Sequence, residues 1–111
     1  MPRKSDAIWE ALNDLRKALN DAYWEIADQK EADRFLALAQ DIDAIQDDLD
    51  RADIKAGTAE YINLKTRVGG VNKKLVRLKK DIGKIIHSVE TVTKVVGCID
   101  QAVALATKYF V

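Results

Sequence analysis

The sequence is poor in residues that interrupt secondary structure and in residues that cross-link it. One proline and five glycines among 111 residues provide too few turns for a fold of many short strands. The single cysteine, Cys98, excludes an internal disulfide framework and is typical of a reducing compartment. Hydrophobic residues make up 48% of the chain, which excludes a disordered tail. A single all-helical domain over residues 1–111 is therefore expected.

The sequence also lacks a long apolar run. No apolar segment follows the charged start at residues 1–6, so we expect no secretory signal peptide. The most apolar stretch, residues 89–111, is interrupted by charged side chains and is too polar for a transmembrane span. These features predict a cytoplasmic protein and leave open export by a route that uses no signal peptide.

Charge is balanced overall but unevenly placed. Residues 1–56 hold 8 basic and 14 acidic side chains, whereas residues 57–111 hold 10 basic and 4 acidic ones. The two halves should therefore attract each other. Between them, Gly57 is suited to ending one helix and Thr58 to capping the next, so we predict a turn at residues 56–58.

Apolar residues after this turn recur with alternating spacings of four and three, from Leu64 to Phe110. Because a loop would break this phase, the pattern predicts one long helix over residues 58–110. The predicted fold class is all-α: an antiparallel helical hairpin or coiled coil of an arm (residues 5–55) and this long helix. Two such hairpins would complete a four-helix bundle by dimerisation. The alternative is a compact three- or four-helix bundle within one chain.

The first half carries two apolar runs, from Ile8 to Ile26 and from Phe35 to Ala52, which are out of phase by two residues. The phase changes within residues 28–34. We favour a bulge in a continuous arm over a turn that divides the arm into two helices. In the second case, Trp24 should be buried within one chain.

One antiparallel register aligns the core layers of the second run with the long helix, from Phe35 opposite Leu78 to Ala52 opposite Tyr61. This register places opposite charges at all three of the flanking g pairs, and such pairs select one register among several. The first run continues along the same partner, with Ile26 opposite Ile85. The expected charge pairs are Arg34 with Asp81, Asp41 with Lys74, and Asp48 with Arg67.

Beside the first run, the flanking positions are apolar instead of charged, which widens the apolar face beyond what two helices can bury. Two further apolar residues point outward beside the change of phase. Together these positions predict an interface with a second copy or with another helical protein. The candidate interface residues are Trp9, Ala11, Ala18, Trp24, Leu36, Val95, Ala102 and Leu105.

No complete set of catalytic, cofactor-binding or metal-ligating residues is present. The acidic run at residues 41–53 begins like a calcium loop, but Ile45 stands at a ligand position and the turn glycine is missing. Carboxylates at positions 28, 31, 47 and 50 resemble magnesium ligands, yet the last two face solvent in the predicted register. His87 and Cys98 have no second histidine or cysteine nearby. We therefore expect no enzyme activity, cofactor or metal.

A basic stripe lies on the outer face of the long helix. Lys73, Arg77, Lys80 and Lys84 are spaced by four, three and four residues, which suits an anionic surface. No aromatic residues are interleaved, so nucleic acid is not an expected partner. The sequence predicts a non-enzymatic helical protein interaction or assembly module. The alternative is a membrane-active hairpin that binds lipid or forms part of a pore.

Overall fold

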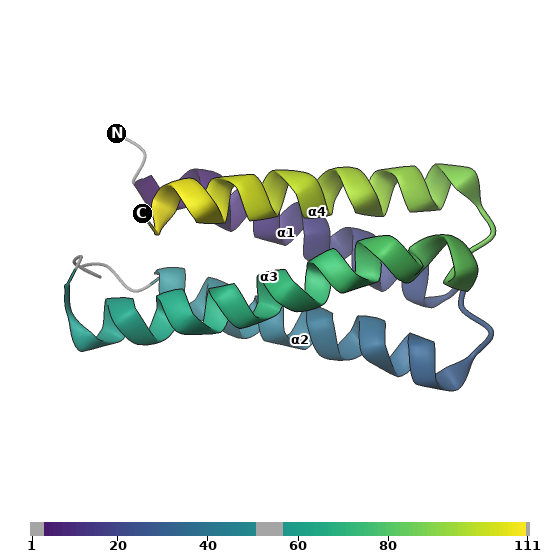
Figure 1. Cartoon of the computed structure of the whole chain (residues 1–111), viewed down its shortest axis with the longest axis horizontal. Helices are drawn as coiled ribbons and strands as arrows, with labels where there is room; N and C mark the ends of the chain where they lie inside the picture. The colour runs from purple at the N-terminus through teal and green to yellow at the C-terminus, as the bar shows by residue number, and fades with distance from the viewer. Residues whose placement is uncertain (1–3, 51–56, 111) are drawn as a thin grey trace.

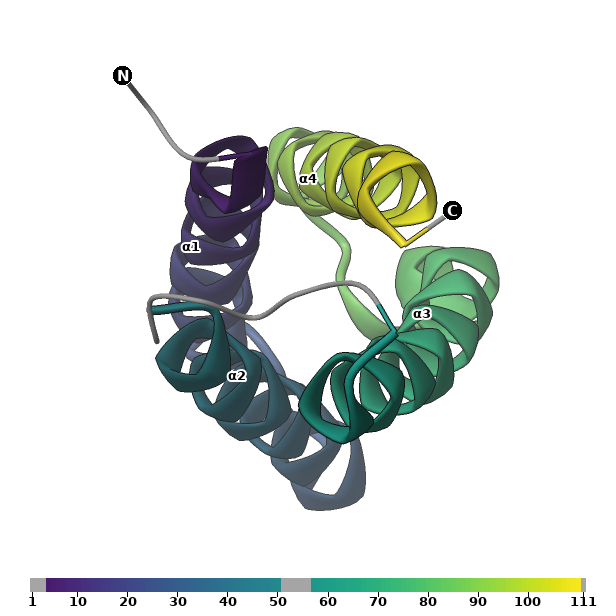
Figure 2. The ribbon, with the colours of Figure 1, turned by 90° about the vertical axis from the view of Figure 1, so that its left-hand side faces the viewer.

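A computed structural model describes residues 4–50 and 57–110, and this part of the chain is helical with no strand. It contains α1 (Lys4–Tyr23), α2 (Gln29–Asp50), α3 (Ala59–Ile85) and α4 (Val89–Tyr109). Successive helices run antiparallel, so the α1–α2 and α3–α4 connections lie at the same end (Figure 1). Viewed along the helices, α1 and α3 occupy opposite corners of the bundle (Figure 2). The all-α class and the four-helix arrangement are thus confirmed, and one chain supplies all four helices.

The arm predicted over residues 5–55 is divided, which corrects the favoured continuous helix. α1 ends at Tyr23, and a turn occupies residues 24–28. The carboxylate of Asp28 accepts hydrogen bonds from the backbone N–H groups of Lys30 (2.9 Å) and Glu31 (3.2 Å). This cap satisfies two N–H groups that have no partner within the helix, so α2 begins at Gln29. The last residues of the predicted arm, 51–55, lie outside the described residues.

The single helix predicted over residues 58–110 is also wrong. α3 ends at Ile85 and α4 begins at Val89. The hydroxyl of Ser88 accepts a hydrogen bond from the backbone N–H of Thr91 (3.3 Å), which caps α4. Only residues 86–88 intervene, so Ile85 and Val89 keep the spacing of four that a continuous helix would give. The apolar phase therefore continues through a reversal of direction.

The turn predicted at residues 56–58 agrees with the structure where the structure describes it. Gly57 has φ +88°, a left-handed conformation that glycine adopts without a Cβ penalty. The hydroxyl of Thr58 accepts a hydrogen bond from the backbone N–H of Tyr61 (3.2 Å) and caps α3. Ala56 lies outside the described residues.

The core runs along the whole bundle, but the four helices do not contribute equally. α1 packs most closely against its neighbours α2 and α4, because alanines such as Ala11, Ala18 and Ala102 line these contacts. α3 lies less closely against α2 and α4, since its buried side is a narrow stripe of larger residues flanked by charged ones. The buried residues of α3 are Leu64, Val68, Val71, Leu75, Leu78 and Ile82.

Candidate interaction surface

The seam between α2 and α3 is crossed by ion pairs at the three positions that the sequence predicts. Their formation confirms the antiparallel register of these two helices. All of them are at least partly exposed, so they select the register more than they stabilise the fold. The pairs are Arg34 Nη1 with Asp81 Oδ2 (3.1 Å), Lys74 Nζ with Asp41 Oδ2 (3.4 Å), and Arg67 with Asp48.

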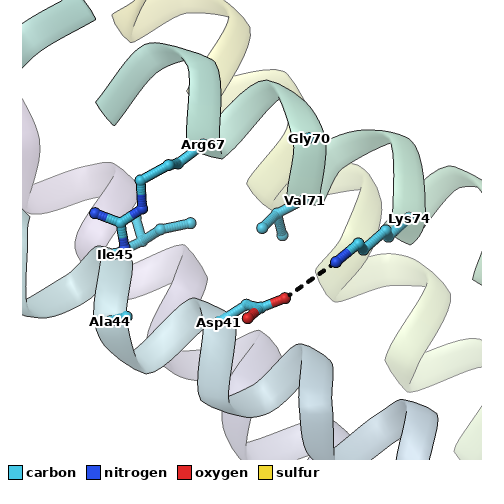
Figure 3. A pocket seen from close by; sticks show the side chains of 7 residues that line it. All are labelled: Asp41, Ala44, Ile45, Arg67, Gly70, Val71 and Lys74. Carbon is cyan, nitrogen blue, oxygen red and sulfur yellow. Dashed lines mark hydrogen bonds and ion pairs between the residues drawn. The ribbon is translucent and has the colours of Figure 1, made fainter. Parts of the chain in front are cut away.

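Between the ion pairs of Asp41 and Arg67, the seam is hollow. Ala44 on α2 and Gly70 on α3 have side chains too small to fill the space between the helices, and a cleft of about 220 Å³ remains (Figure 3). Ile45 also lines this cleft. The α2–α3 side of the bundle therefore has an apolar depression with charged groups at its rim.

The predicted basic stripe lies beside this cleft, on the outer side of α3. Lys73, Arg77, Lys80 and Lys84 are all exposed. Among residues 4–50 and 57–110, none of the four has a carboxylate partner within ion-pair distance. These cations thus remain available to a molecule outside the chain.

Glycines interrupt the outer side of α3 at positions 69, 70 and 83. A Cβ atom added at any of them would meet no described atom within 4 Å other than its own helix and chain neighbours. A glycine in a helix interior is less stable than alanine by about 1 kcal/mol. The packing of the described bundle does not require glycine at these positions.

Four of the eight predicted interface residues belong to the buried core of the single chain. Ala11, Ala18, Val95 and Ala102 are at most 3% exposed, because α1, α2 and α4 pack together where a second copy was expected. A partner therefore has no access to these four side chains in the folded chain. The other candidates are half-buried Trp9 and Leu105, and exposed Trp24 and Leu36.

Trp24 is 83% exposed, so the expectation that a turn would bury it is wrong. It lies one residue beyond the end of α1, past the packed part of the helix, and its ring contacts Tyr23 edge-on at 5.2 Å. The next residue, Glu25, accepts a hydrogen bond from the Thr91 hydroxyl (2.7 Å) through its carboxylate. The turn is therefore held against α4 by a polar contact that leaves the indole outside.

Gln46 is a buried residue that the sequence pattern did not identify. Its side-chain oxygen accepts a hydrogen bond from Arg16 Nε (3.1 Å), and its side-chain nitrogen donates to the carbonyl of Trp9 (3.3 Å). Arg16 also donates to Asn13 Oδ1 (2.8 Å). Gln46 lies seven residues after buried Ala39, on the same side of α2, and this spacing could have indicated its burial. The signal is weak because glutamine is a polar residue that usually faces solvent.

Among the described residues, the chemically reactive side chains form no recognisable site. His87 is exposed, and Cys98 is a half-buried free thiol. Burial raises the pKa of this thiol, and the nearby carboxylate of Asp14 raises it further, against a smaller lowering by Lys94. The described residues contain no group of three or more His, Cys, Asp or Glu side chains placed to hold a metal ion. None of the described helices is long and apolar enough to cross a membrane.

Comparison with protein-family models, curated proteins and solved structures finds no match to this chain. Its own surfaces are therefore the basis for a functional proposal. Of these surfaces, the α2–α3 side combines a cleft, unpaired cations and open glycine positions.

Proposed function

We propose that the chain is a non-enzymatic helical module for protein–protein interaction and that its binding surface is the α2–α3 side of the bundle. The proposal rests on one observation, the charge and the shape of the outer side of α3. There, four exposed cations lack ion-pair partners among the described residues, and Gly70 borders an open cleft.

The glycines favour a protein that packs closely against α3. Replacing Gly70 by alanine introduces no contact within 4 Å in the described structure, so the fold gains no packing from the missing Cβ. A partner helix does gain from the glycine, because the distance between packed helices depends on the side chains at the contact. The missing side chain lets the partner helix approach α3 more closely. The small Ala44 across the cleft extends the same close approach to α2.

The cations favour an acidic partner. Exposed charges contribute little to folding, but a surface of one sign increases the association rate of a partner of the opposite sign and fixes its orientation. Lys73 and Lys80 lie one above the other along the outer side of α3, so a helix with carboxylates seven residues apart fits them.

A photoreactive amino acid placed at position 77 of the full-length chain tests this proposal. Irradiation in cells that make the protein should give a protein adduct. The adduct should disappear when Lys73→Glu and Lys80→Glu are added. The control is the same amino acid at Asp21, an exposed position on α1. Equal adduct yields at the two positions, or no adduct at position 77, would contradict the proposal.

The second candidate function, membrane activity, depends on the same basic stripe. Its pore-forming version also requires α4 to release Val95, Ile99 and Ala102 from the core. Vesicles of phosphatidylcholine with and without phosphatidylserine separate the two functions. A protein-binding module stays in the supernatant with both kinds of vesicle. The membrane function would be favoured if the protein sediments only with the anionic vesicles and if Lys80→Glu abolishes this sedimentation.

The proposed compartment is the cytoplasm. The support for it is Cys98, the only cysteine of the sequence, which has no second thiol in the chain to pair with.

A further inference from the structure

We propose that the partner bound by the α2–α3 side is a second copy of this chain, related to the first by a two-fold axis parallel to the helices. This inference rests on the proposed function and names the partner of that same surface. It differs from the dimer expected from the sequence, whose central residues are buried in the single chain.

The charges of the two helices make this side of the molecule complementary to itself. α2 carries seven acidic and two basic residues, whereas α3 carries eight basic and two acidic ones. The two helices lie next to each other and antiparallel (Figures 1 and 2). Not all of these charges face outward beside the seam, and Asp41 and Asp48 are already paired with α3. The exposed groups that form no ion pair with described residues include the carboxylates of Asp33 and Asp47 on α2 and the cations of the basic stripe on α3, so an acidic strip and a basic strip run side by side along the bundle.

Only one orientation of the two-fold axis uses this complementarity. In a symmetric dimer, the same patch of both subunits forms the interface. An axis parallel to the helices places α2 of each copy on α3 of the other, so that acidic strips face basic strips. An axis perpendicular to the helices and within the interface places α2 on α2 and α3 on α3, which brings like charges together.

The axis also fixes which residues face each other. Rotation about an axis parallel to the helices leaves every residue at its own height along the bundle. Residues that are level within one chain, as Asp41 and Lys74 are, mark that height. Asp33 of one copy is then level with Lys80 of the other, and Ala44 with Gly70, where the small side chains allow close packing.

The available area matches what such a dimer needs. The bundle measures 42 by 26 by 19 Å. Even its narrower long side spans about 800 Å², which is what each partner of a standard protein interface buries.

Two complementary charge reversals test the inference on the full-length chain. The first variant carries Lys73→Glu and Lys80→Glu, which removes two of the four unpaired cations of the basic strip and places two carboxylates there. The second carries Asp33→Lys and Asp47→Lys, which replaces two exposed carboxylates of the acidic strip by ammonium groups. None of these four side chains takes part in an ion pair of the described structure. Circular dichroism checks that both variants fold.

Sedimentation equilibrium should show that the wild type dimerises and that each variant alone dimerises on the order of 100-fold more weakly. An equimolar mixture of the two variants should recover the dimer, because one of its two helix pairs is then of wild-type sequence and the other sets the introduced lysines of α2 against the introduced glutamates of α3. No recovery in the mixture would overturn the proposed axis, and unchanged dimerisation of the single variants would overturn the proposed surface.

A wild-type chain that remains monomeric at about 1 mM would rule out a second copy as the partner. That result leaves the protein-binding function intact if position 77 gives a stripe-dependent adduct with another protein. The function itself fails only if position 77 gives no specific adduct. The two experiments therefore distinguish failure of the dimer from failure of the binding function.

Discussion

Arg34 of α2 donates a hydrogen bond from Nη1 to Oδ2 of Asp81 of α3, 3.1 Å away, and it reverses the polarity of the other ion pairs of the seam. This reversal makes the register unique. A slide of α3 by one heptad in one direction places Arg34 opposite Lys74, and a slide in the other direction places Asp41 opposite Asp81. Either slide creates a like-charge pair, whereas three pairs of the same polarity would tolerate it.

The first prediction concerns this ion pair. Asp81→Lys should lower the free energy of unfolding by about 0.5 to 1 kcal/mol, and adding Arg34→Glu should recover part of the loss. Urea denaturation followed by circular dichroism measures both values. Lys17→Glu is the control, because Lys17 is exposed on α1 and forms no ion pair with described residues. Strictly additive effects of the two substitutions would show that Arg34 and Asp81 do not interact.

The second prediction separates stability from association at two glycines of α3. Gly70→Ala and Gly83→Ala should each raise the free energy of unfolding by about 0.5 to 1 kcal/mol, because the added methyl group meets open space. Only Gly70 borders the cleft of the α2–α3 side. Gly70→Ala should therefore weaken dimerisation in sedimentation equilibrium, whereas Gly83→Ala should not. Equal effects of both substitutions on dimerisation would contradict a close approach at Gly70.

The third prediction concerns the buried amide between α1 and α2. Gln46→Ala should lower the free energy of unfolding by about 1 to 3 kcal/mol, because it leaves Arg16 Nε and the Trp9 carbonyl without their partner. Gln40→Ala on the exposed side of the same helix is the matched control and should change stability by less than about 0.5 kcal/mol. A loss no larger than that of the control would mean that water replaces the amide.

The part of the fold that the sequence predicts well is the part with local or paired signals. Thr58 follows the chemistry of helix capping, and the α2–α3 register follows from charges that have one arrangement free of repulsion. The all-helical class follows from the apolar spacing. These signals concern residues close in sequence or pairs whose chemistry is specific.

The reversal at residues 86–88 was not predicted, because a three-residue turn can preserve the apolar spacing of a straight helix. The cap at Ser88 is a local signal for it, but no glycine or proline accompanies this serine. The missed turn also explains the error about the interface. With α4 folded back beside α1, Ala18 and Val95 are buried by their own chain, so these central residues of the expected dimer surface are not accessible to a partner.

The candidate surface also has one feature that the sequence predicts and one that it does not. The basic stripe is visible in the sequence because Lys73 and Lys80 repeat at helical spacing, and the structure leaves both exposed. The cleft at Gly70 depends on which helix lies opposite α3 and at what distance. That information is tertiary, so no pattern within α3 contains it.

The last prediction concerns the reactivity of Cys98. The thiolate is the reactive form of a cysteine, and it carries the charge that burial and the Asp14 carboxylate disfavour. The raised pKa means that Cys98 should react with iodoacetamide more slowly at neutral pH than an unhindered thiol does. Asp14→Asn should lower the pKa and speed the reaction, whereas Lys94→Gln should raise the pKa and slow it.

The measurement is the alkylation rate as a function of pH, followed by intact mass. Asp21→Asn, an exposed carboxylate on the same helix as Asp14, is the control and should leave the pH profile in place. The two substitutions at positions 14 and 94 act in opposite directions, so a change in access to the thiol cannot reproduce both. A pH profile that moves the same way in both variants would show that access, and not charge, limits the reaction.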